Sequence, residues 1–174
     1  MKTFFCFTTL LLSIHCFCQA DRPVSAYVAF NVNSTMYDRT LANNAVGFGA
    51  GLQLYIRTKT WLRAALDVNG EVFGGTKQLY VADGNKPIYS KDEVVTVFAG
   101  IYTQPSKRVF ATFTLGPAFF NNSTYLGIKP GVGYYLVKGR QLAVKICFTN
   151  IFQHDDISNK SFGYFNFSLA VKLF

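Results

Sequence analysis

The chain has 174 residues, of which 50% are hydrophobic, 17% aromatic and only 15% charged, and its mean hydropathy is +0.19. This composition is unusual for a soluble domain, yet no uninterrupted apolar run of 18 residues follows residue 20, which excludes a membrane protein built from helices. The formal net charge of +8 does not indicate nucleic-acid binding, because the basic residues are scattered along the chain.

The first twenty residues have the pattern of a secretory signal. Lys2 precedes an apolar stretch over residues 4–17, and the segment ends in the small residue Ala20. We expect cleavage after Ala20; lipoprotein processing at Cys16 or Cys18 is a weaker alternative. A single domain of residues 21–174 then remains, and its one cysteine, Cys147, cannot form an internal disulfide.

The remaining sequence alternates between apolar and polar residues, which is the pattern of β-strands. In residues 46–57, apolar side chains at the even positions face one side, while glycines, Gln53, Tyr55 and Arg57 face the other. Seven further segments show the same alternation, although Phe98 interrupts it on the polar face of its segment. The eight predicted strands are residues 24–34, 46–57, 62–72, 93–103, 109–120, 125–137, 142–152 and 163–174.

The connections alternate between tight turns and looser polar loops, as an up-and-down barrel requires. We expect tight turns at residues 58–60, 104–108 and 138–141, and loops at residues 35–44, 73–92, 121–124 and 153–160. An even number of strands places both termini on the turn side, which we expect to be periplasmic, with the loops outside the cell. Within the second loop, the dipeptide Asp83-Gly84 predicts a small hairpin that extends this loop.

The apolar face of the predicted barrel could point inward, toward the lumen, or outward. In a soluble lipocalin-like carrier it would point inward, whereas here it carries no charge in the well-defined strands, which suits lipid. The polar face combines small residues with isolated charges, which suits a narrow lumen that side chains fill. We therefore predict an all-β, eight-stranded antiparallel up-and-down transmembrane β-barrel without a wide diffusion pore. The charged residues expected to line its lumen are Arg57, Arg63, Asp67, Glu71, Lys129, Lys145 and Lys172.

Aromatic residues near the strand ends predict two interfacial girdles, one near the turns and one near the loops. The expected members are Trp61, Tyr102, Tyr134 and Phe174 near the turns, and Phe30, Phe73, Phe119, Phe152 and Phe165 near the loops. Basic residues in the tight turns are expected to meet anionic lipid headgroups. They are Lys59, Lys107, Arg108, Lys138 and Arg140.

Three segments carry a family resemblance: the ending CQA of the signal, the segment GIKPGVGYY at residues 127–135, and the final strand FGYFNFSLAVKLF. With them the chain resembles the small outer-membrane β-barrel proteins, particularly the porin-family-like barrels of Bacteroidetes. The resemblance implies an outer-membrane location and a role for Phe174 and its strand as an insertion signal for the barrel-assembly machinery. The sequence departs from the usual pattern in one respect, because alternation places Phe174 on the face of Lys172.

Residues 154–159 form the one cluster with catalytic residue types. It is similar to the His-x-Ser-Asn element of outer-membrane lipid A deacylases, but three residues separate His154 from Ser158. Positions i and i+4 of a strand lie roughly 13 Å apart, so a solvated polar loop is the favoured interpretation. The leading hypothesis is a structural or loop-mediated interaction role; the alternatives are a lipid A-modifying hydrolase that uses His154 and Ser158, and the soluble carrier. We expect a monomer without cofactor or metal whose partners are outer-membrane lipids, lipopolysaccharide and, during insertion, the assembly machinery.

Overall fold

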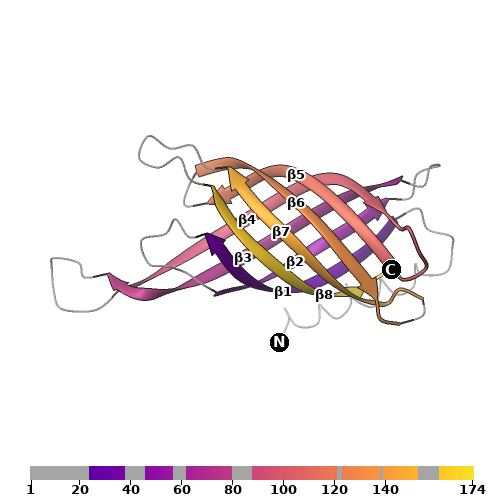
Figure 1. Ribbon diagram of the computed structural model, residues 1–174, viewed down its shortest axis with the longest axis horizontal. Helices are drawn as coiled ribbons and strands as arrows, with labels where there is room; N and C mark the ends of the chain where they lie inside the picture. The colour runs from indigo at the N-terminus through magenta and orange to yellow at the C-terminus, as the bar shows by residue number, and fades with distance from the viewer. Residues whose placement is uncertain are drawn as a thin grey trace, which may run out of the picture.

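The computed structural model describes residues 24–37, 46–56, 62–79, 88–120, 123–137, 139–152 and 161–174. These residues form eight β-strands: β1 (Val24–Tyr37), β2 (Val46–Ile56), β3 (Leu62–Leu79), β4 (Ile88–Thr103), β5 (Val109–Phe120), β6 (Ser123–Tyr135), β7 (Leu142–Phe152) and β8 (Phe162–Lys172). Each strand pairs antiparallel with the next, and β8 pairs with β1 to close the barrel (Figure 1). The predicted fold class is confirmed.

The predicted strand bounds hold closely for most of the barrel and differ most at β3 and β4. These two strands continue beyond their pairs with β2 and β5, so that Gln78 pairs with Tyr89 and Leu79 with Ile88. The hairpin predicted within residues 73–92 is therefore present as a two-stranded extension of the wall (Figure 1). We call the end of the barrel from which it extends the loop end, and the opposite end, with both ends of the described chain, the turn end.

The apolar face of the strands points outward. Phe48 is 64% exposed and Val132 58%, whereas Lys129, on the opposite face, is 1% exposed. A lipocalin-like soluble carrier would have the reverse arrangement, so this alternative is wrong. Among the described residues, no helix is long and apolar enough to cross a membrane.

Side chains fill the interior in three layers. The turn-end cluster consists of aromatic and small residues: Tyr27, Ala29, Tyr55, Ala65, Tyr102, Phe110, Tyr135, Ala143 and Ala170. The loop-end cluster is also apolar: Phe73, Val94, Phe98, Ala118, Ile151, Phe162 and Tyr164. Between them lie buried polar and charged side chains, which we call the polar belt. Its principal members are Asn31, Asn33, Gln53, Asp67, Asn69, Glu71, Thr96, Thr114, Lys129, Lys145, Asn166 and Ser168.

Two residues expected in the lipid-facing girdles lie inside the barrel instead. Tyr102 is 1% exposed and belongs to the turn-end cluster, and Phe73 is 0% exposed and belongs to the loop-end cluster. Both predictions were wrong because position along a strand was used to place the side chain, although alternation decides the face. Of the remaining expected girdle residues, Phe30, Phe119, Tyr134 and Phe152 are exposed, Phe165 and Phe174 are half-buried, and Trp61 lies outside the described residues.

Candidate functional site

The centre of the polar belt is the carboxylate of Asp67 on β3. Lys145 Nζ, which reaches across the lumen from β7, donates a hydrogen bond to Asp67 Oδ2 at 3.0 Å. Lys129 Nζ on β6 lies 3.6 Å from Asp67 Oδ1. Asn69 also donates its amide to the carboxylate. All three charged side chains are almost fully buried, so each charge depends on the others in place of water.

Glu71 is the second buried carboxylate of the polar belt. It accepts hydrogen bonds from the hydroxyl of Tyr164 and, at 2.9 Å, from Asn166 Nδ2. Tyr164 belongs to the loop-end cluster, so this hydrogen bond joins two layers of the interior. The same Asn166 Nδ2 also donates a hydrogen bond to Asn33 Oδ1 at 2.8 Å.

Amide and hydroxyl side chains connect the two carboxylates around the wall. Ser168 donates to Asn31 Oδ1 at 2.7 Å, and Asn31 Nδ2 donates to Asn69 Oδ1 at 3.1 Å. Because Asn69 bonds Asp67, the network runs from β8 through β1 to β3. Within the described residues Lys129 Nζ has no hydrogen-bond partner, in contrast to the ammonium of Lys145.

Aromatic rings close the lumen at the turn end. The rings of Tyr55 and Tyr102 lie 4.5 Å apart between centroids, and those of Phe110 and Tyr135 4.8 Å apart. The hydroxyls of Tyr102 and Tyr135 are 2.9 Å apart and hydrogen-bonded. Gly133, which pairs with Phe110, leaves space for this packing, because a Cβ at this position would overlap the Phe110 ring.

The loop-end cluster closes the other end in the same way. Phe73 packs edge-on against Phe162 and Tyr164, with centroids 5.2 and 5.1 Å away. A Cβ on Gly47 would lie 2.6 Å from the ring of Phe73, and a Cβ on Gly127 would lie 2.5 Å from the ring of Phe98. The glycines of the polar face thus make room for aromatic rings on nearby strands of the wall.

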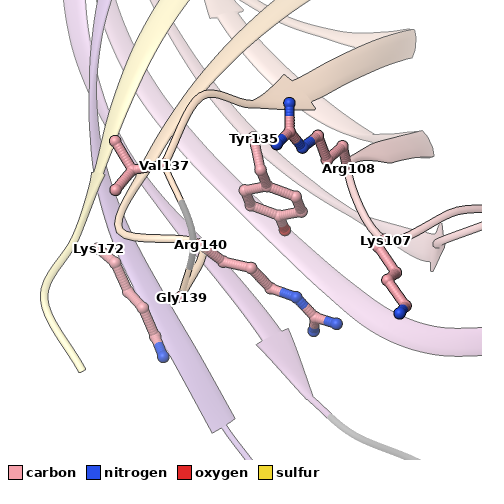
Figure 2. Close-up of a pocket in the computed structure, with 7 residues that line it drawn as sticks. All are labelled: Lys107, Arg108, Tyr135, Val137, Gly139, Arg140 and Lys172. Atoms are coloured by element: carbon pink, nitrogen blue, oxygen red, sulfur yellow. The ribbon is translucent and has the colours of Figure 1, made fainter.

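A basic pocket of about 720 Å³ lies outside the turn-end cluster. We call it the basic mouth, and Figure 2 shows its lining residues, Lys107, Arg108, Tyr135, Val137, Gly139, Arg140 and Lys172. Arg140 has a left-handed backbone with φ of 60°, and its guanidinium lies 5.8 Å from the ring centre of Tyr135. Arg108 Nη1 donates to the hydroxyl of Tyr134 at 2.9 Å.

The charged residues predicted to line the lumen lie in different parts of the barrel. Asp67, Glu71, Lys129 and Lys145 lie in the polar belt. Lys172 lines the basic mouth. Arg63 is half-buried at the turn end, with its guanidinium 5.5 Å from the ring centre of Tyr102. Arg57 and the candidate catalytic pair His154 and Ser158 lie outside the described residues, as do Lys59 and Lys138 of the tight turns.

The predicted list of charged residues omitted the neutral members of the network. Alternation already places Asn31, Asn69, Asn166 and Ser168 on the polar face, but only the register of the closed barrel shows which of them meet. In the described part of the chain, no group of three or more His, Cys, Asp or Glu side chains is placed to hold a metal ion. The interior is filled by side chains, with the polar belt between two apolar clusters, and the basic mouth is a pocket at the turn end.

No protein-family model matches the sequence, and no curated protein is significantly similar to it. Among solved structures, the chain is similar to a de novo designed transmembrane β-barrel, with a TM-score of 0.55, 14% identity, and coverage of 87% of this chain and 98% of that one. It is also similar to the outer membrane protein Ail of Yersinia pestis in a phospholipid bilayer nanodisc, with a TM-score of 0.57, 11% identity, and coverage of 85% and 98%.

A crystal structure of Ail, the attachment invasion locus protein, in complex with the heparin analogue sucrose octasulfate gives a TM-score of 0.54 at 10% identity, with coverage of 86% of this chain and 97% of that one. At these identities the likeness establishes the fold alone. The protein has the fold of a small transmembrane β-barrel.

Proposed function

We propose that this protein is an integral outer-membrane β-barrel that conducts no solutes and acts as a structural or interaction protein through its loop end. The observation that carries the proposal is the filled lumen, in which an aromatic cluster covers each end of a hydrogen-bonded polar belt. The outward apolar face and the fold shared with Ail support the membrane location. A cleaved signal at residues 1–20, recognition of Phe174 by the assembly machinery and a place among the porin-family-like barrels of Bacteroidetes belong to the same proposal.

The loop end faces the outside of the cell in this proposal, and the wall contacts outer-membrane lipids and lipopolysaccharide. The β3–β4 extension is the first candidate for a contact with a partner, because it carries the chain beyond the rest of the wall. The loop-end segments contain acidic and basic residues in nearly equal numbers. The binding of a sulfated sugar by Ail is therefore not carried over to this end of the chain.

Conductance measurements test the closed lumen. The full-length mature protein would be inserted into planar bilayers, and its folding verified by faster migration of the unheated than of the boiled sample in gel electrophoresis. We expect no current steps above those of the bare bilayer, because the turn-end and loop-end clusters occlude the lumen. Reproducible single-channel steps from the folded sample would contradict the proposal.

A shortened variant separates the interaction role from the structural role. Residues 75–90 would be replaced by an Asn-Gly turn, which leaves the barrel pairs up to Gly74 and Lys91 intact, and cells carrying this variant would be compared with wild-type and deletion strains. Loss of adhesion with unchanged detergent resistance supports an interaction through the extension. A structural role is supported if the deletion strain is sensitive to detergent and the shortened variant is not. A deletion strain that behaves as wild type in both assays argues against the proposal.

A further inference from the structure

The basic mouth gathers four cations from three separate parts of the chain. Lys107 and Arg108 come from the β4–β5 turn, Arg140 from the β6–β7 turn and Lys172 from the end of β8 (Figure 2). Its remaining lining residues are Tyr135, Val137 and Gly139, so none of the described residues around the pocket is acidic. Four like charges around one hollow create a positive potential that attracts anions.

Backbone hydrogen bonds fix the turns that carry these cations. Tyr135 N donates to Arg108 O at 2.8 Å, which ties the β4–β5 turn to β6. Lys172 N donates to Gln141 O at 2.8 Å, which ties the β6–β7 turn to β8. The charged side chains therefore start from fixed positions, and less conformational entropy is lost when they close on a ligand.

The backbone of Arg140 gives a second, independent indication. Arg140 and the preceding Gly139 both have positive φ, 60° and 87°. Glycine adopts this conformation readily, but it is uncommon for arginine, and Asn or Asp are the residues usually found there. A non-glycine residue in this backbone conformation motivates the hypothesis that its side chain has a role. Here the guanidinium of Arg140 lies over the Tyr135 ring at the pocket.

The two arginines contact neighbouring tyrosines of β6 that point to opposite faces of the barrel wall. Arg108 bonds the hydroxyl of Tyr134, whose side chain is exposed on the outer, lipid-facing surface. Arg140 lies over Tyr135, which belongs to the turn-end cluster inside the barrel. The mouth is thus accessible to a group in the adjacent lipid leaflet and to a molecule in the aqueous phase.

We propose that the basic mouth binds a phosphate-bearing ligand. Planar guanidinium groups match the oxygens of phosphate in a two-pronged geometry, and lysine adds a mobile point charge. The volume of about 720 Å³ is within the range of sites for organic molecules, and Val137 and Tyr135 offer apolar contacts beside the charges. The phosphate is part of a larger group: an anionic phospholipid headgroup or a soluble phosphorylated compound.

The test uses the mature full-length protein, labelled with ¹⁵N, and the backbone amide of Gly139 as a reporter within the pocket. One arm titrates inorganic pyrophosphate into the protein in lauryldimethylamine oxide micelles, which contain no phosphate. The other arm compares nanodiscs of phosphatidylcholine with nanodiscs that also contain phosphatidylglycerol. The variants are Arg140→Gln and Lys107→Gln, and the matched control is Lys91→Gln, which removes one positive charge from β4 at the loop end.

We expect each mouth variant to weaken pyrophosphate binding by about fivefold to tenfold, as for loss of one charge-assisted hydrogen bond, while Lys91→Gln binds as wild type. A saturable pyrophosphate response of Gly139 with this pattern supports a soluble ligand. A response only to phosphatidylglycerol, lost in the mouth variants, supports a lipid headgroup. No response to either probe, or an equal effect of Lys91→Gln, overturns the proposal. Lys107 is an exposed turn residue, so its variant keeps the test valid if Arg140→Gln does not fold.

Discussion

Substitution of Asp67 by Asn is the most direct test of the polar belt. Asparagine has nearly the same shape, so the change removes the negative charge and replaces one acceptor oxygen by an amide donor. Lys145 Nζ at 3.0 Å and Lys129 Nζ at 3.6 Å then lose their shared carboxylate, and both ammonium groups stay in a lumen where their side chains are 1% exposed. Glu71 is the one other carboxylate of the belt among the described residues.

The expected cost follows from the burial of these charges. Removing one partner of a buried ion pair costs about 3 to 5 kcal/mol, because the remaining charge is left without compensation. Lys145→Met should cost less than Asp67→Asn, since Lys129 still faces the carboxylate after that change. In the double variant the two losses should not add, and we expect a coupling of about 1 to 3 kcal/mol between contacting residues.

Urea-induced unfolding from lipid vesicles measures these free energies, with the fluorescence of the single tryptophan, Trp61, as the signal. Lys129→Met serves as a comparison, because its ammonium has no hydrogen-bond partner among the described residues and its removal should cost the least of the three. If the unfolding free energy of Asp67→Asn lies within about 1 kcal/mol of the wild-type value, the reasoning is refuted, since a loss that small is typical of an exposed ion pair.

Three further predictions concern other parts of the molecule. Gly133→Val should lower the unfolding free energy by about 1 to 3 kcal/mol through overlap with Phe110, whereas Gly70→Val, with no neighbour within 4 Å, should have little effect in the same urea experiment. Phe174→Ala should reduce the amount of protein in outer-membrane fractions while the purified variant still folds in detergent. Equal amounts of variant and wild-type protein in these fractions would argue against an insertion signal. His154→Ala should leave the lipid A profile unchanged in mass spectrometry, and a shifted profile would revive the hydrolase hypothesis.

Strand faces could be predicted from this sequence because lipid and lumen impose opposite requirements on successive residues. Val132 and Ile146 point outward and Lys129 and Lys145 inward, as alternation requires. The bounds of β5 and β7 also agreed, because a turn rich in Pro, Ser, Gly or Lys lies beside each of these apolar segments. The β3–β4 extension was predicted from its Asp-Gly turn, but the shift in register between Gly74 and Gln78, where the extension joins the barrel, was not.

Contacts inside the lumen could not be predicted, since they depend on which strands lie opposite each other after closure. Lys145 and Asp67 are 78 residues apart, and nothing in the local sequence of either strand indicates the other. The packing of the aromatic residues inside the lumen could not be predicted for the same reason. Phe98 interrupts the polar face in the sequence, but the space for its ring comes from Gly127, two strands away. An aromatic residue on a glycine-rich polar face is the signal that could have identified this packing.

The polar belt also explains how the barrel keeps its register although apolar residues are abundant on both faces. A shift of one residue would exchange the two faces of a strand. With an apolar interior such a shift would cost little in lipid, but here it would move Asp67 or Lys145 to the outer face, where a lysine at the middle of the bilayer costs roughly 2 to 4 kcal/mol. The buried charges therefore disfavour the shifted barrel. Consequently, Asp67→Leu combined with Lys145→Leu should fold to a mixture of species that gives several unheated gel bands, even if its main species resists urea.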